Sequence, residues 1–173
     1  MIEKIKNFSN EFFDEIVSIR RHIHKYPELS FNEYETSSYI KSILNKWHIP
    51  FKDNIADNGI VVLLTGKNGD AKTIALRADF DALPIDELNS VIYKSVNKGV
   101  MHACGHDAHT ASLLGSLKIL NTLKDEWEGS IKFIFQPAEE QFPGGAKQMI
   151  KEGVLQLPTV NKVIGQHVFP DLE

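Results

Sequence analysis

Residues 59–79, GIVVLLTGKNGDAKTIALRAD, contain the stretch that decides the fold predicted by this sequence. Two apolar runs, residues 59–65 and 73–78, have the length and composition of buried strands. The segment between them contains Asn68-Gly69, and an Asn-Gly pair between apolar runs favours a tight hairpin. We therefore expect two antiparallel strands that are direct neighbours in one sheet.

Helical periodicity is found on both sides of this pair. Residues 2–25 carry apolar residues at steps of three and four, which predicts an amphipathic helix that ends before Pro27. A second helix is expected over residues 31–47, with Ser30 and Glu33 at the spacing of a capping box. The elements expected later in the chain are a helix over 108–123, a strand over 130–136, a short helix that begins at Gly144-Gly145, and a strand over 160–168.

This order of helices and strands is that of an α/β domain. We expect a mixed, largely parallel sheet flanked by helices. In open sheets of this kind, binding sites gather at the carboxyl ends of the strands. Polar clusters follow three of the expected strands, after Ala78, after Gln136 and at Gln166-His167, so we expect the functional site at that end of the sheet.

Composition narrows the class of protein. A chain of 173 residues suits one domain, and 42% hydrophobic and 24% charged residues are ordinary for a globular protein. A net charge of −4 gives no electrostatic reason to expect a nucleic-acid or anionic-membrane partner. There is no apolar run of about 18 residues, the first residues do not resemble a signal peptide, and one cysteine excludes an internal disulfide. We therefore expect a cytoplasmic protein.

Three of the seven histidines and the only cysteine lie within residues 102–109, HACGHDAH. Thiolate and imidazole both bind divalent metals such as zinc, and Cys104 and His106 point to the same side of an extended backbone. The start of the expected helix beside them should lower the pKa of the thiol, and Asp107 is placed to orient a ligand histidine. The alternative interpretation is a buried, inert cysteine among surface histidines.

A second cluster, QPAEE at residues 136–140, follows an apolar strand. The adjacent carboxylates of Glu139 and Glu140 point in different directions, so one can ligate a metal while the other moves a proton. That division of roles suits metal-assisted hydrolysis. Taken by itself, the pair could equally be a solvated charge pair in a loop.

Two further signals lie at strand ends. Asp79 and Asp81 follow the strand over residues 73–78, where the alternative is that they bind turn amides. His167 ends the last strand and completes a set of Cys, His, Glu and His. Three other histidines fall in the N-terminal helices and are interpreted as surface or packing residues, namely His22, His24 and His48.

Together these clusters resemble the M20 family of metallopeptidases and aminoacylases, and most closely its amidohydrolase branch. That branch includes N-acyl-amino-acid amidohydrolases, hippurate hydrolases, N-acetyl-diaminopimelate deacetylases and auxin-conjugate hydrolases. The matching stretches occur in the family's order and cover almost the whole chain from Arg20 onward. They are RRHIHKYPELSFNEYET, ALRADFDALPI, GVMHACGHDAHTASLLG, IFQPAEE with the following GGAKQMI, and GQHVFP.

The resemblance implies two divalent metal ions at the mouth of an α/β catalytic domain, with zinc, manganese, cobalt and nickel all compatible with the ligands. It implies four metal ligands, namely Cys104, His106, Glu140 and His167. It also implies that Glu139 is the general base and that Asp81 supports the metal-site loop, so both belong to the catalytic set. The implied reaction is hydrolysis of the amide bond of a small N-acyl amino acid.

Members of the family are much longer than this chain. We therefore expect residues 1–173 to be the N-terminal portion of the catalytic domain. The lid domain, through which full-length members can form homodimers, and the second half of the catalytic domain would be absent. A further ligand histidine would be absent too, and His102 and His109 are the candidates to replace it. The open edge of such a partial sheet should promote self-association.

Two other functions compete with the hydrolase. The chain could be a truncated, non-catalytic remnant that binds metal without turning over substrate. It could also be a cysteine hydrolase with Cys104 as nucleophile and a nearby histidine as base, although that interpretation leaves Glu139 and Glu140 unexplained.

Overall fold

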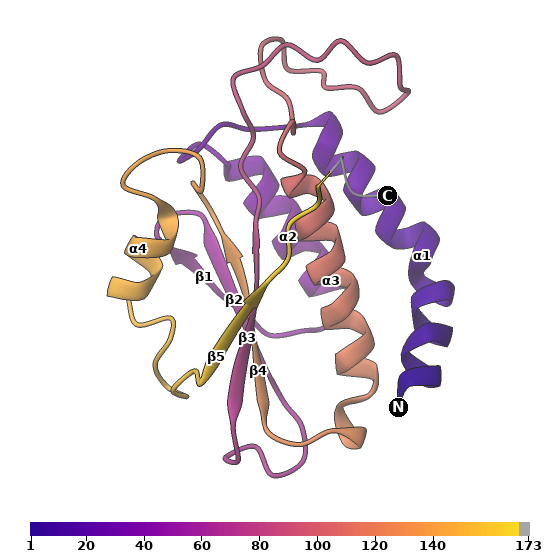
Figure 1. Ribbon diagram of the computed structural model, residues 1–173, viewed down its shortest axis with the longest axis vertical. Helices are drawn as coiled ribbons and strands as arrows, with labels where there is room; N and C mark the ends of the chain where they lie inside the picture. The colour runs from indigo at the N-terminus through magenta and orange to yellow at the C-terminus, as the bar shows by residue number, and fades with distance from the viewer. Residues whose placement is uncertain (170–173) are drawn as a thin grey trace.

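The computed structural model describes residues 1–169, which form one sheet with helices on both faces (Figure 1). The sheet has the strand order β1-β2-β4-β3-β5. The strands are β1 (Lys52–Ile55), β2 (Gly59–Thr65), β3 (Thr73–Asp79), β4 (Ser130–Gln136) and β5 (Lys162–Gly165). Two pairings are antiparallel, β1 with β2 and β2 with β4, and two are parallel, β4 with β3 and β3 with β5. The α/β class with a mixed sheet flanked by helices is confirmed.

Three helices cover one face of the sheet and one short helix covers the other (Figure 1). The larger layer consists of α1 (Ile2–Lys25), α2 (Tyr34–Lys46) and α3 (His106–Thr122), and a 3-10 turn, η1 (Lys124–Glu126), follows α3. The smaller layer is α4 (Gly145–Lys151). No helix in residues 1–169 is long and apolar enough to cross a membrane.

The expected hairpin of β2 and β3 is wrong, because β4 lies between these two strands. Val62 of β2 and Leu76 of β3 both pair with Phe133 of β4, antiparallel and parallel respectively. All seven residues of β4 are buried, so this strand gains most by occupying the centre of the sheet. The Asn-Gly turn reverses the chain locally, but it does not decide which strand becomes the neighbour.

The larger core lies between the sheet and the three-helix layer. Its fully buried members include Phe80, Phe133 and Phe135 from the sheet side and Leu114 and Leu117 from α3. Burial of each such side chain stabilises the fold by roughly 1.5–3 kcal/mol. This packing holds α3 against β3 and β4, so the first turn of α3 lies at the carboxyl ends of these strands.

The predicted capping box at the start of α2 is also wrong. The helix begins at Tyr34, and Glu33, at its N-cap position, makes no capping hydrogen bond. The free amides of the first turn are instead bound by Glu28, whose carboxylate accepts hydrogen bonds from the backbone of Glu35 (3.1 Å) and Thr36 (2.7 Å). The two side chains of the expected box therefore remain available for contacts elsewhere in the molecule.

Element boundaries differ from expectation mainly at the sheet edges. β5 covers Lys162–Gly165 and is shorter than the expected 160–168. β1 was not expected, because its four residues, KDNI, are mostly polar; in the structure they alternate between exposed and partly buried. The helix over 108–123 begins two residues earlier, at His106, so this histidine is part of α3.

Candidate metal centre

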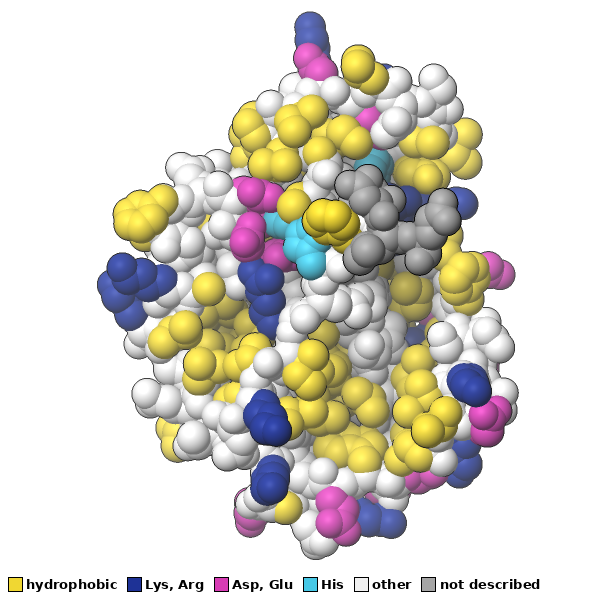
Figure 2. All heavy atoms as spheres, in the orientation of Figure 1, with side chains coloured by type: hydrophobic (Ala, Val, Ile, Leu, Met, Phe, Trp, Pro, Cys, Tyr) yellow, Lys and Arg dark blue, Asp and Glu magenta, His cyan; other side chains and the backbone are white. Residues whose placement is uncertain are grey.

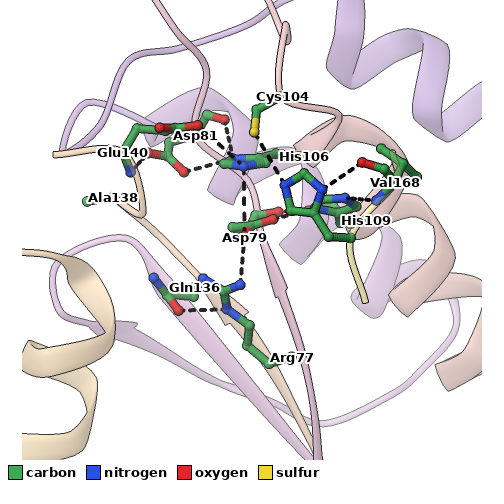
Figure 3. A network of polar contacts seen from close by, with 12 residues as sticks. Arg77, Asp79, Asp81, Cys104, His106, His109, Gln136, Ala138, Glu140 and Val168 are labelled. Atoms are coloured by element: carbon green, nitrogen blue, oxygen red, sulfur yellow. Dashed lines mark hydrogen bonds and ion pairs between the residues drawn. The ribbon is translucent and has the colours of Figure 1, made fainter. Parts of the chain in front are cut away.

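Three strand ends and the start of α3 meet at one place in the structure. Asp79 ends β3, Glu140 lies in the loop after β4, and His106 is the first residue of α3 (Figure 3). His167 follows β5. In the space-filling view, histidine and acidic side chains gather on the surface above these strand ends (Figure 2). The polar clusters that the sequence separates by tens of residues thus form one site.

The donor atoms of the predicted ligands and of the predicted base lie close together in two overlapping groups. Donor atoms of Cys104, His106 and His167 all lie within 4.8 Å of one another, and so do those of His106, Glu139 and Glu140. The Sγ of Cys104 is 3.4 Å from Nε2 of His167, and Nε2 of His106 is 3.7 Å from Oε1 of Glu140. His106 belongs to both groups, so the two groups adjoin.

His106 has the environment of a metal-ligating histidine. Its Nδ1 donates to the backbone oxygen of Asp81 (2.9 Å) and lies 3.2 Å from Oδ1 of the same residue. Its Nε2 is buried and has no hydrogen-bond partner in residues 1–169. Ligand histidines characteristically donate one ring N–H to a carboxylate or carbonyl and keep the other nitrogen for the metal. A thiol, imidazoles and carboxylates around this unpaired nitrogen fit a zinc-like divalent ion.

Asp81 fixes the two sides of the site relative to each other. Its carboxylate accepts hydrogen bonds from Oγ of Ser30 (2.6 Å) and from the backbone N–H of Glu140 (2.9 Å), in addition to the contact with His106. Burial alone would raise the pKa of Asp81, but the hydrogen bonds from His106, Ser30 and the Glu140 backbone outweigh it and lower the pKa to about 2. The geometry therefore favours a positioning role for Asp81.

A second positioning chain was missed by sequence reasoning. Oδ2 of Asp79 pairs with Arg77 (2.7 Å), and Oδ1 of Asp79 accepts from Nδ1 of His109 (2.7 Å). Nε2 of His109 then accepts from the backbone N–H of Val168 (2.9 Å), the residue after His167. Both nitrogens of His109 thus make hydrogen bonds, while its donor atom also lies within 4.8 Å of those of Asp79 and His106. Replacement of a missing ligand by His109 stays a prediction. The position of His109 one helical turn after the first residue of α3 could have suggested a role beside the site.

Asp107 contacts α1 and does not orient a ligand histidine, contrary to expectation. Its Oδ2 accepts from Nε of Arg20 (2.6 Å) and from Nδ1 of His24 (2.9 Å). Nε2 of His24 lies 3.0 Å from Oε1 of Glu87, so His24 is buried between two carboxylates. His102, the other proposed replacement ligand, lies beside His24 and belongs to none of the three groups of donor atoms found in residues 1–169. The remaining histidines of the N-terminal region are exposed, as expected, namely His22 and His48.

The thiol of Cys104 does not have the lowered pKa that was expected from the start of α3. Burial, followed by the contact with Glu140, raises its pKa to about 11. The carboxylates of Glu140, Glu139 and Asp79 also disfavour a negative charge on Cys104. A thiol with this pKa is protonated at neutral pH, which argues against Cys104 as a nucleophile. A cation bound among the same carboxylates would favour the thiolate.

Comparison with known proteins gives a consistent family. The sequence model of the protein family described as "Peptidase family M20/M25/M40" matches residues 75–173 of this chain. The chain is 43% identical over 171 residues to the N-acyl-L-amino acid amidohydrolase of Geobacillus stearothermophilus, covering 99% of this chain and 45% of the relative. It is 44% identical to the N-acetyl-L-cysteine deacetylase of Bacillus subtilis, covering 91% of this chain and 37% of the relative.

A solved structure shows the same fold. The YXEP protein of Bacillus subtilis, described as a dinuclear metal binding peptidase of the M20 family, superposes with a TM-score of 0.87 at 41% identity. The match covers 94% of this chain and 45% of that one. The chain thus spans less than half the length of the curated relatives and of the solved structure compared here.

Proposed function

The chain belongs to peptidase family M20/M25/M40, and from that premise we propose that its metal centre hydrolyses the amide bond of N-acyl amino acids in the full-length protein. The observation that carries the proposal is Nε2 of His106, which is buried and has no hydrogen-bond partner in residues 1–169. Donor atoms of Cys104 and Glu140 lie near it, so together they could bind a cation. The names of two relatives, an N-acyl-L-amino acid amidohydrolase and an N-acetyl-L-cysteine deacetylase, support the substrate class.

The residues of the site divide the work of such a reaction. Two bound divalent ions would supply a water of lowered pKa and polarisation of the substrate carbonyl. The ligands of these ions would be Cys104, His106, Glu140 and His167. Glu139, an exposed carboxylate next to them, would accept the proton of the attacking water and deliver it to the nitrogen of the leaving amine. Asp81 would keep its hydrogen bonds to His106 and to the Glu140 backbone throughout.

The test combines metal content with hydrolysis of N-acetyl- and N-benzoyl-amino acids. We expect hydrolysis that requires added metal and stops with a chelator. Glu139→Gln should keep the metal and lower the rate by about 10²–10⁴-fold, because only proton transfer is removed. Glu11→Gln, at an exposed position of α1, serves as the matched control and should leave the rate unchanged.

Two outcomes would count against the proposal. An unchanged rate in metal-loaded Glu139→Gln would remove this residue as the base. A full-length protein that binds metal and hydrolyses none of these amides would favour a metal-binding remnant without catalytic activity. The choice among zinc, manganese, cobalt and nickel, a cytoplasmic location and homodimerisation of the full-length protein remain predictions from the sequence.

A further inference from the structure

A buried carboxylate between α1 and α2 has no part in the proposed chemistry. Glu33 lies at the N-cap position of α2 and is 0% exposed. Carboxylates are seldom fully buried unless they are paired or hydrogen-bonded, because removal from water disfavours their charge. The contacts that hold Glu33 therefore indicate what the residue is for.

Glu33 binds the loop that carries the proposed base. Its Oε1 accepts a hydrogen bond from the backbone N–H of Ala138 (2.7 Å), which lies 105 positions later in the chain. Its Oε2 accepts from Nδ2 of Asn58 (3.1 Å), and the backbone oxygen of Asn58 accepts in turn from Oγ of Ser37 (2.8 Å). The carboxylate is thus fixed from one side by Asn58 and presents its other oxygen to the loop.

Ala138 is the residue at which the chain turns from β4 into the site. It is fully buried and adopts the left-handed conformation, with φ at +48°. A residue other than glycine adopts this conformation at a cost and keeps it where its surroundings hold it. The loop is held at three points: Glu33 binds the Ala138 N–H, Gly145 donates to the Ala138 oxygen (2.8 Å), and Asp81 binds the Glu140 N–H.

The two buried carboxylates act on different residues of the loop. Asp81 binds the backbone of Glu140, the proposed ligand. Glu33 binds the amide one residue before Glu139, the proposed base. With the amides on both sides of it fixed, Glu139 has little freedom to change the direction in which its side chain leaves the backbone.

We propose that Glu33 is a positioning residue that acts through the Ala138 amide to direct Glu139 toward its reacting partner. The proposal rests on the proposed function, because it takes Glu139 as the base. It predicts that loss of the Glu33 acceptor lowers the rate of the chemical step more than the binding of substrate or metal. A displacement of about 1 Å at a catalytic group can lower a rate by about 10²-fold.

The test compares two buried or half-buried carboxylates of the same segment. Glu33→Leu removes the acceptor at similar size, and Glu33→Gln keeps one oxygen that can accept from Ala138. Glu28→Leu is the matched control, because Glu28 also binds two backbone amides but only those of α2. For Glu33→Leu we expect kcat to fall by about 10–100-fold, with KM and bound metal nearly unchanged. Glu33→Gln should recover most of the rate, and Glu28→Leu should lower the melting temperature without changing kcat.

Hydrogen exchange of the Ala138 amide gives a second readout that does not depend on activity. Glu33→Leu should lose protection at Ala138, whereas Glu28→Leu should keep it. If the wild-type chain hydrolyses its substrate and folded Glu33→Leu retains kcat, the inference is overturned. If the wild-type full-length protein is inactive, the proposed function fails, and amide exchange alone decides the role of Glu33. Should Glu33→Leu not fold, Asn58→Ala removes the other anchor of Glu33 and is expected to reduce kcat and protection in the same direction.

Discussion

Gly105 shows how tightly a single residue constrains the site. It has a φ of +82°, and a Cβ at this position would overlap Cγ2 of Val168. Gly99 has a similar φ of +77° but no atom within 4 Å of a Cβ. We expect Gly99→Ala to cost about 1 kcal/mol from backbone conformation alone, and Gly105→Ala to cost about 1–3 kcal/mol more from the overlap.

Urea denaturation of the two alanine variants measures this difference. Gly105→Ala should also bind metal more weakly, because Val168 follows the predicted ligand His167. Equal losses of stability in the two variants would mean that Val168 moves away without cost.

Asp81 predicts a specific pH dependence of stability. Its pKa falls from 3.8 in the unfolded chain to about 2 in the folded protein, which corresponds to about 2 kcal/mol. Folding favours the ionised form, so this stabilisation is present above pH 3.8 and is lost as the pH falls toward 2. Asp81→Asn should therefore cost about 2 kcal/mol or more at pH 7, and the difference from the wild type should shrink below pH 4.

Denaturation of both metal-free proteins at pH 7 and pH 3 tests this expectation. Asp57→Asn, at an exposed position, is the control and should show no such change. A cost for Asp81→Asn that is the same at both pH values would mean that the charge of Asp81 contributes nothing.

The residue types that suggest a metal site could be predicted from the sequence, but many of their neighbours could not. Cys104, His106 and Glu140 stand in dense local clusters, so their residue types alone suggest a metal. The partner of Asp107 is His24, 83 positions away, and it is decided by how α1 crosses α3. Ser30 and Glu33 predict a capping box because a serine followed three residues later by a glutamate is typical of a helix start. The sequence near these residues contains no signal for the distant amide or imidazole with which each forms a hydrogen bond.

At the scale of elements, His24 connects α1 with the start of α3. The hydrogen bond to Asp107 raises the pKa of His24, burial opposes the rise, and Glu87 adds to it. Folding therefore favours the imidazolium, and this stabilisation is fully present below pH 6.5 and is lost as the pH rises through the folded-state pKa. His24→Asn should lower the free energy of unfolding more at pH 6 than at pH 9.

Thermal denaturation at the two pH values measures the change in that difference. His22→Asn is the neighbouring control on α1, because partial loss of contact with water and the charge of Lys25 lower the pKa of His22. For that variant, the loss of stability should not grow at pH 6. A loss at His24 that does not depend on pH would indicate a neutral imidazole between Asp107 and Glu87.

Helix positions were predicted better than strand order, for a physical reason. The apolar period of α1 is local, and Pro27 follows its end within two residues. Strand order depends instead on where each strand buries most surface. The two faces of β4 pack against opposite helical layers, with Phe133 in one core and Ile134 in the other. To place β4 at the centre of the sheet, one would have had to compare how much surface each strand can bury.

At the scale of the whole molecule, β5 leaves one edge of the sheet open within residues 1–169. It pairs with β3 alone, and Val163 and Ile164 are each 53% exposed. Hydrophobic side chains are exposed on the face of the molecule that is turned toward the viewer, where β5 lies (Figure 2). An unpaired apolar edge can bind the same edge of a second molecule. We expect the 173-residue chain to associate as its concentration rises.

Sedimentation velocity over a range of concentrations tests the association. Val163→Lys should reduce it, because a charge on an edge strand opposes strand pairing. Leu88→Lys, at a 90% exposed loop position, should leave it unchanged. A monomer at every concentration would contradict the prediction.

The central position of β4 in the sheet also affects the order in which the strands can pair during synthesis of the chain. A ribosome adds about 5–20 residues per second, so β2 and β3 exist for several seconds before β4 is synthesised. During this time the two strands can pair with each other through the Asn68-Gly69 turn, and that pairing must open before β4 enters between them. Two of the four proposed ligands, Glu140 and His167, follow β4 and β5, so the complete ligand set does not exist until both strands have been synthesised. Metal uptake by the nascent chain would therefore report when β5 has been added to the sheet.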